Sequence, residues 1–156
     1  MCNSDESLEK EDCYVRLLRR WQMDGFLISL FSDGSSKALR RLSEKNVPFV
    51  FIDRRAVGID ADAVLSDSVD GTYQATKHLI ERGHQRIGIT FGIREATTTE
   101  KRLVGYRKAL EEARIPFREE LIAYGGYCIT GGMEWIEQFL AAPVPPTATF
   151  STDNLI

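Results

Sequence analysis

The chain has 156 residues, of which 43% are hydrophobic and 28% charged, and this is the composition of an ordinary globular α/β protein. Its formal net charge of −3 provides no global basic field that would draw nucleic acid to it. Three scattered cysteines, none in a C-x-x-C pair, argue against a disulfide framework and give no support to a metal site. The N-terminus is acidic and polar, unlike a signal peptide, and no apolar run approaches a membrane span. We therefore expect a protein of the reducing cytoplasm with no membrane partner.

Patterns that predict helices and strands alternate along the first part of the chain. Ser4, Asp5 or Ser7 can cap a first helix, whose predicted apolar face comprises Tyr14, Leu17, Leu18 and Trp21. The run 25–30 predicts a buried strand. A helix with Ala38, Leu39 and Leu42 inward follows, and the next predicted strands are 48–53 and 63–65.

The second part of the chain repeats this alternation. Ser68 can cap a helix that ends at Gly83, where a left-handed glycine is the natural stop. The later elements predicted are a strand at 87–91, a helix at about 99–113, a strand at 121–124, a helix at 131–142 and a strand at 147–150. Trp21, Trp135 and Phe139 are assigned to the core. Such alternation predicts parallel sheets covered on both faces. Because the chain ends just after a strand, we expect it to be a segment of a longer protein.

The most specific stretch lies between Asp67 and Ile93. It carries the order G-x-x-x-A-x-x-H-L-x-x-x-G-H-x-x-I, from Gly71 to Ile87. Three further segments of this chain are also informative: V-P-F-V-F-I-D-R (47–54), K-R-L-V-G-Y-R-K-A-L (101–110) and P-P-T-A-T-F-S-T-D (145–153). With these, the chain resembles the effector-binding core of the lactose-repressor/galactose-repressor (LacI/GalR) family of bacterial transcription regulators. It departs from the family at Ser66-Asp67, where Asp-Asn is usual, and at Thr152, where Asn is frequent.

The resemblance implies a fold of periplasmic-binding-protein type I, built from two doubly wound α/β lobes around a small-molecule effector. Residues 1–66 would form a partial N-terminal lobe and residues 67–156 a partial C-terminal lobe. The helix-turn-helix headpiece that binds operator DNA, the hinge helix and the last third of the core would be absent from this chain. The family also implies a homodimer in the intact protein, and it implies no cofactor.

Two charged residues are the first candidate ligand contacts. Asp53 ends a strand at its carboxyl side, where open α/β sheets bind ligands, although a loop aspartate is the simpler interpretation from the residues alone. We place Arg102 in the first turn of a helix, where the dipole disfavours a cation, so it is a solvated charge or is held for a function. The resemblance makes both of them cleft residues, with Asp53 accepting effector hydroxyls and the planar fork of Arg102 gripping hydroxyls or a carboxylate.

Four further residues complete the predicted set. By resemblance, Thr98 is a polar contact in the loop before the arginine. Tyr127 either packs on its neighbours or stacks on a sugar face. Thr152 and Asp153 end the last strand and would face the same cleft, unless Asp153 caps a helix beyond the chain. Ala96 stands where purine-responsive relatives carry an arginine, and this favours a sugar over a nucleobase.

The sequence therefore predicts the effector-sensing core of a LacI-type repressor that binds a sugar or a sugar derivative. An alternative is the sugar-binding protein of an ABC-type uptake system, which shares the fold and would carry a signal peptide where the regulator carries its headpiece. An enzyme is the weaker alternative, since G-x-G-x-x-G, G-x-x-x-x-G-K-[ST], H-E-x-x-H and G-x-S-x-G are all missing. His78 and His84 are interpreted as structural, and Arg40-Arg41 as a solvated helix face.

Overall fold

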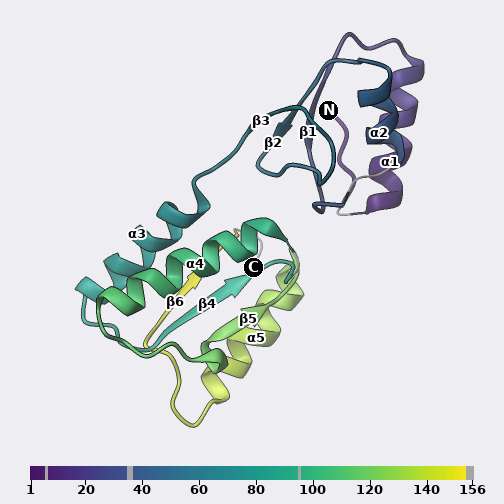
Figure 1. The fold of residues 1–156 in the computed structure, drawn as a ribbon. Helices are drawn as coiled ribbons and strands as arrows, with labels where there is room; N and C mark the ends of the chain where they lie inside the picture. The colour runs from purple at the N-terminus through teal and green to yellow at the C-terminus, as the bar shows by residue number, and fades with distance from the viewer. Residues whose placement is uncertain (6, 35–36, 95, 154–156) are drawn as a thin grey trace. The chain divides into compact units, whose positions relative to one another are not determined.

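The computed structural model describes residues 1–5, 7–34, 37–94 and 96–153, so the last three residues of the predicted C-terminal lobe lie outside the described residues. The chain divides into two compact units, Met1–Ser66 and Asp67–Ile156. Each unit contains one three-stranded parallel sheet with helices packed against it (Figure 1). The predicted α/β class with parallel sheets is confirmed.

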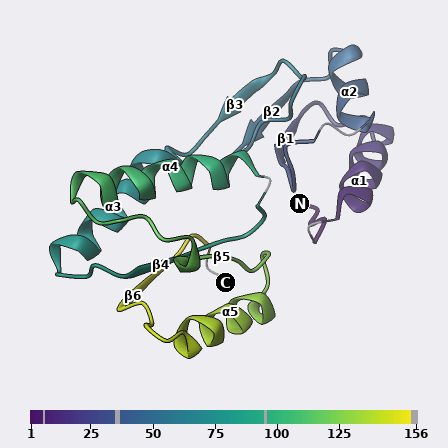
Figure 2. The same cartoon turned by 60° about the horizontal axis from the view of Figure 1, so that its bottom comes forward.

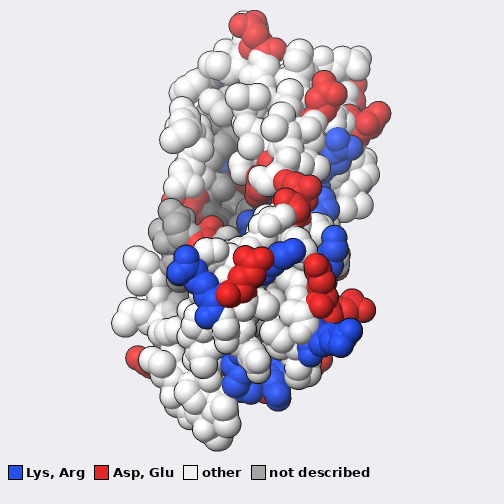
Figure 3. Space-filling model, turned by 90° about the vertical axis from the view of Figure 1, so that its left-hand side faces the viewer, with Lys and Arg blue, Asp and Glu red and all other residues white. Residues whose placement is uncertain are grey.

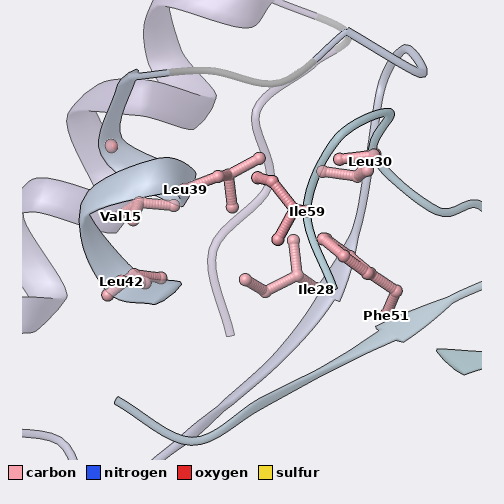
Figure 4. Packing of buried hydrophobic residues seen from close by; sticks show 9 residues of the cluster. Val15, Ile28, Leu30, Leu39, Leu42, Phe51 and Ile59 are labelled. Atoms are coloured by element: carbon pink, nitrogen blue, oxygen red, sulfur yellow. The ribbon is translucent and has the colours of Figure 1, made fainter. Parts of the chain in front are cut away.

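The first unit consists of a sheet with strand order β1-β2-β3 and two helices. Its elements are α1 (Leu8–Arg20), β1 (Phe26–Ser29), α2 (Lys37–Glu44), β2 (Phe49–Ile52) and β3 (Asp62–Val64). The helices α1 and α2 lie side by side in both ribbon views (Figures 1 and 2). Figure 4 shows Val15, Leu39 and Leu42 from these helices in one cluster with Ile28 and Phe51 from the strands. The inward face predicted for α2 is therefore confirmed, because its three named residues are buried.

The apolar face predicted for α1 is wrong. The buried residues of this helix are Glu11 and Val15, while the side chain of Trp21 is 63% exposed and that of Leu17 is 40% exposed. The buried face passes through Glu11 because its Oε2 accepts a hydrogen bond from the backbone N–H of Phe31 at 3.0 Å. The spacing of apolar residues in the sequence gives no indication of a buried carboxylate of this kind. Trp21 lies past the last helical residue, so the helical spacing does not apply to it.

The second unit is a sheet with strand order β5-β4-β6, and every residue of the central strand is buried. Its elements are α3 (Ser68–Glu81), β4 (Ile87–Phe91), α4 (Thr97–Glu112), a 3₁₀ turn (Glu119–Leu121), β5 (Ile122–Tyr124), α5 (Ile129–Ala141) and β6 (Ala148–Ser151). Helices α3 and α4 cover one face and α5 the other (Figures 1 and 2). Ile87, Ile89 and Phe91 pack among the first pair of helices, whereas a Cβ at Gly88 would lie 2.4 Å from the Phe139 ring of α5. This is the doubly wound arrangement that the alternation predicts.

The helix boundaries differ from the predictions by one or two residues. The N-cap of α3 is Asp67 and not Ser68, because the Asp67 carboxylate accepts the N–H of Asp70 at 3.0 Å. The predicted stop at Gly83 is confirmed by its φ of 91°. Helix α4 begins at Thr97, two residues earlier than expected.

The contact between α3 and α4 depends on one glycine and on a polar cluster. A Cβ at Gly105 would lie 2.2 Å from the carbonyl oxygen of Val69, so only glycine permits this approach of the two backbones. On the solvent side, the Tyr73 hydroxyl donates to Glu112 Oε2 at 2.5 Å, and Lys77 lies 3.6 Å from the same carboxylate. Acidic and basic side chains are interspersed in the space-filling view of Figure 3, so this face carries no field of one sign. None of the described helices is long and apolar enough to cross a membrane.

Candidate functional site

The carboxyl ends of the three parallel strands in the second unit meet at one edge of the sheet. Hydrogen bonding between neighbours continues past the strand ends, from the N–H of Gly125 to Phe91 O at 3.0 Å and from the N–H of Thr152 to Thr90 O at 3.2 Å. The structure therefore brings Tyr127, which follows β5 by three residues, to the same edge as Thr152, which follows β6 directly. Ligands of open α/β sheets bind at this kind of edge.

The ring of Tyr127 lies against the backbone at the end of β4. A Cβ at Gly92 would lie 2.2 Å from two carbons of this ring, so the two residues are in close contact only because residue 92 has no side chain. Sequence analysis did not single out Gly92. The glycine that directly follows the predicted strand at 87–91 is the signal that could have marked it. The contact agrees with a tyrosine that packs on its neighbours, and its predicted role in stacking on a sugar stays a prediction.

Three threonine hydroxyls near this edge, those of Thr90, Thr98 and Thr152, are buried without a hydrogen-bond partner among the described residues, and the last two lie beyond the strands. Thr98, in the first turn of α4, is 3% exposed, and neither its Oγ1 nor the Oγ1 of Thr152 has a partner among the described residues. The adjacent Thr99 is satisfied, since its hydroxyl donates to Ile93 O at 2.7 Å. A buried hydroxyl without a partner typically costs about 1–3 kcal/mol, so both positions are suited to a ligand that supplies the missing hydrogen bond.

Asp153 is held in a tight turn at the end of β6. Its backbone N–H donates to Ser151 Oγ at 3.4 Å, and this hydroxyl donates to the carbonyl oxygen of Asp153 at 2.5 Å. The side chain is partly buried. The turn fixes the backbone at the sheet edge, where a carboxylate can accept hydrogen bonds from ligand hydroxyls.

Arg102 lies four residues after Thr98, so the two side chains are on the same face of α4. Its predicted placement in the first helical turn is wrong, because α4 begins at Thr97 and Arg102 is in the second turn. The helix dipole acts mainly within the first turn, and so the argument from an unfavourable dipole no longer applies. Arg102 is partly buried and forms no ion pair with any described residue.

A second cation at the edge was missed by the sequence analysis. The guanidinium carbon of Arg94 lies 4.2 Å from the centroid of the Tyr124 ring, in a cation–π contact just beyond β4. Ala96 is buried and is the N-cap of α4, which therefore begins without a side-chain cap. Among the described residues, no group of His, Cys, Asp or Glu could hold a metal ion.

Asp53 belongs to the first unit, where it has an unusual backbone. Its φ of 68° is in the left-handed region, and its N–H donates to Val64 O at 2.9 Å. Arg54 Nε lies 3.8 Å from Asp53 Oδ2, and the buried Arg54 side chain donates to Phe31 O. A non-glycine residue in this region is uncommon, but Asp5, Gln22, Asn46 and Arg114 share this backbone, so it does not by itself mark a site. A role for Asp53 at the same ligand as the five residues of the second unit stays a prediction.

Comparison with known proteins identifies the family. The family model described as "Periplasmic binding proteins and sugar binding domain of LacI family" matches residues 2–154. The chain belongs to this family. It is 36% identical to the HTH-type transcriptional repressor PurR of Yersinia pestis (strain Pestoides F), over 100% of the chain and 46% of that repressor. The chain thus spans about half the length of the curated relatives that it matches.

Solved structures of other family members have the same fold. The transcription regulator CcpA of Lactococcus lactis superposes with a TM-score of 0.84 at 27% identity, over 99% of this chain and 56% of that one. A LacI family transcriptional regulator from Enterococcus faecium, solved with bound ribose, superposes with a TM-score of 0.79 at 26% identity, over 99% of this chain and 55% of that one. The identification of a periplasmic-binding-protein-like core is therefore confirmed.

Proposed function

We propose that this chain is the effector-sensing core of a DNA-binding transcription regulator of the LacI family, and that its effector is a sugar or a sugar derivative. The observation that carries the proposal is the sheet edge of the second unit. The buried hydroxyls of Thr98 and Thr152, which have no partner among the described residues, lie there with the tyrosine ring and a carboxylate. A polyhydroxylated ligand can satisfy both hydroxyls, and its apolar face can stack on Tyr127.

A sugar is favoured over a purine on two grounds. By the family resemblance, Ala96 stands where purine-responsive members carry an arginine, and its buried methyl side chain offers no donor. The relative from Enterococcus faecium is bound to ribose. The names of the relatives favour a regulator over an uptake protein or an enzyme, since each is a transcriptional regulator or repressor. In the intact protein, effector binding would shift a conformational equilibrium and thereby change the affinity of a homodimer for operator DNA.

The experiment is a thermal-shift titration of the full-length protein with D-ribose, followed by a panel of other sugars. A ligand at a hundredfold excess over its dissociation constant should raise the free energy of unfolding by about 2.7 kcal/mol. Arg102→Ala should abolish this gain and leave the unliganded melting temperature nearly unchanged. Lys101→Ala, which removes an exposed cation from the preceding position, is the matched control and should keep the gain.

Asp53 is tested in the same assay. If Asp53 accepts effector hydroxyls, Asp53→Asn should weaken the ligand-induced gain, because an amide offers one acceptor oxygen in place of a charged pair. If Arg102→Ala lowers the unliganded melting temperature by as much as it lowers the ligand-induced shift, Arg102 is a structural residue. That result would contradict its assignment as a ligand contact. Turnover of any sugar by the full-length protein would contradict the proposal as a whole.

A further inference from the structure

A hollow of about 310 Å³ lies between α1 and α2 of the first unit, remote in sequence from the residues of the sheet edge. It is lined by four arginines and two small apolar residues: Val15, Arg16, Arg19, Arg20, Ala38 and Arg41. Val15 and Ala38 are 7% and 4% exposed, so they form its floor, and the arginines complete a lining that is mainly apolar. The volume is at the lower end of the range of small-molecule sites.

Most of the positive charge around this hollow is uncompensated. Arg16 Nε lies 3.3 Å from Asp12 Oδ2, but Arg19, Arg20 and Arg41 form no ion pair with any residue that the structure describes. Arg19 and Arg20 are in the last turn of α1, and Arg41 is in the last turn of α2. The negative ends of the two helix dipoles, about half an elementary charge each, offset only part of the charge of these three arginines. The sequence analysis interpreted Arg40-Arg41 as a solvated helix face. Such a face needs no hollow with an apolar floor, so the combination of arginines and hollow points to a ligand.

We propose that this hollow binds the phosphate monoester group of a small organic molecule. A planar guanidinium presents paired donors that match phosphate oxygens. A phosphate monoester has three terminal oxygens to set against the three uncompensated arginines, whereas a carboxylate has only two. The apolar floor formed by Val15 and Ala38 accommodates the organic part of the ester. The site is a second one, separate from the proposed effector site, and does not depend on it.

The test is isothermal titration calorimetry of the full-length protein with phenyl phosphate, in which an apolar ring carries a phosphate monoester. Inorganic phosphate and phenol are titrated in parallel to separate the two halves of the ligand. We expect saturable binding of phenyl phosphate, with at least tenfold weaker binding of either half. The double variant Arg20→Gln with Arg41→Gln should weaken phenyl phosphate binding tenfold or more. Lys45→Gln, which removes an exposed cation just beyond α2, should change it less than twofold.

Two further variants and one competitor complete the design. Arg20→Lys and Arg41→Lys keep the charge but lose the paired donors, so each should bind phenyl phosphate several-fold more weakly. Unchanged binding in the lysine variants, or in the double glutamine variant, would overturn the proposal. Equal binding of inorganic phosphate, or displacement of phenyl phosphate by duplex DNA, whose phosphates are diesters, would also overturn it. Arg20 and Arg41 are exposed, so we expect the variants to fold, and circular dichroism checks this directly.

Discussion

The ring of Tyr127 rests on the backbone of Gly92, so that a Cβ at residue 92 would lie 2.2 Å from two of its ring carbons. The two residues come from different strand ends, and the N–H of Gly126 donates to Gly92 O at 3.1 Å to hold the segments together. The position of the aromatic ring thus depends on the absence of a side chain at the residue that follows β4. This makes Gly92 a positioning residue for any ligand that stacks on Tyr127.

Gly92→Ala should reduce ligand affinity more than stability. The new methyl group has to displace the far end of a flexible side chain and not backbone, so we expect the free energy of unfolding to fall by about 1 kcal/mol, at the low end of the range for overpacking. The ligand-induced thermal shift should be largely lost because the ring is moved from the edge. The matched control is Gly71→Ala on α3, where a Cβ would meet nothing within 4 Å and the shift should be retained. A full ligand response in Gly92→Ala would assign Tyr127 to packing alone.

Thr98→Val should separate ligand binding from stability. The hydroxyl of Thr98 is buried and has no partner among residues 1–5, 7–34, 37–94 and 96–153, so its replacement by a methyl group should leave the free energy of unfolding unchanged or raise it by about 1 kcal/mol. Ligand affinity should fall, because the ligand loses a hydrogen bond. Thr99→Val is the opposite case, because the Thr99 hydroxyl donates to Ile93 O. This variant should lose about 1 kcal/mol in the free energy of unfolding. Urea unfolding and ligand titration of both variants check this; a destabilised Thr98→Val would reveal a structural hydrogen bond.

Most of the fold could be predicted because the second unit follows the rules of apolar periodicity. The strand at 87–91 is buried throughout, as expected for a central parallel strand, and Gly83 has the left-handed backbone of a helix stop. The first helix could not be placed correctly, because its buried face contains Glu11. A carboxylate that caps the N–H of a residue twenty positions away leaves no periodic signal.

The gathering of strand ends at one edge of the second sheet could be predicted from the sequence, but the contacts made there could not. Strand ends such as Thr152 are visible in a sequence, and parallel strands place them at one edge. The contact of Gly92 with Tyr127 and the missing partner of the Thr98 hydroxyl depend on packing between segments that are distant in the chain. The first is marked in the sequence only by a glycine directly after a predicted strand, and the second has no local sequence signal. The dipole argument for Arg102 failed because the predicted start of α4 was two residues too late. Arg102 is in the second turn of the helix and not in the first.

Gly105→Ala should destabilise the second unit strongly. A Cβ at this position would lie 2.2 Å from Val69 O and 3.0 Å from the N of Tyr73, and these are backbone atoms of α3 that cannot move without shifting the helix. We expect a loss of about 2–3 kcal/mol in the free energy of unfolding, at the upper end of the range for overpacking. In contrast, Gly71→Ala should raise stability by about 0.5–1 kcal/mol, since alanine is the better helix former. Similar stability of the two variants in urea unfolding would contradict the close contact of α3 and α4.

Glu11→Gln should change how stability depends on pH. Burial raises the pKa of Glu11, the hydrogen bond from the Phe31 N–H lowers it in part, and the nearby Asp12 carboxylate raises it. Because the folded pKa is above the unfolded value, the stability that protonated Glu11 contributes is present below the unfolded pKa and is lost as pH rises through the folded one. Glutamine is neutral throughout and keeps an oxygen for Phe31, so the variant should gain stability relative to the parent between pH 4 and pH 7. Urea unfolding across this range measures the difference, with the exposed Glu9→Gln as the control. A difference that stays constant would show that folding does not shift this pKa, and one that shrinks towards pH 7 would show that the native fold favours the ionised carboxylate; either contradicts the prediction.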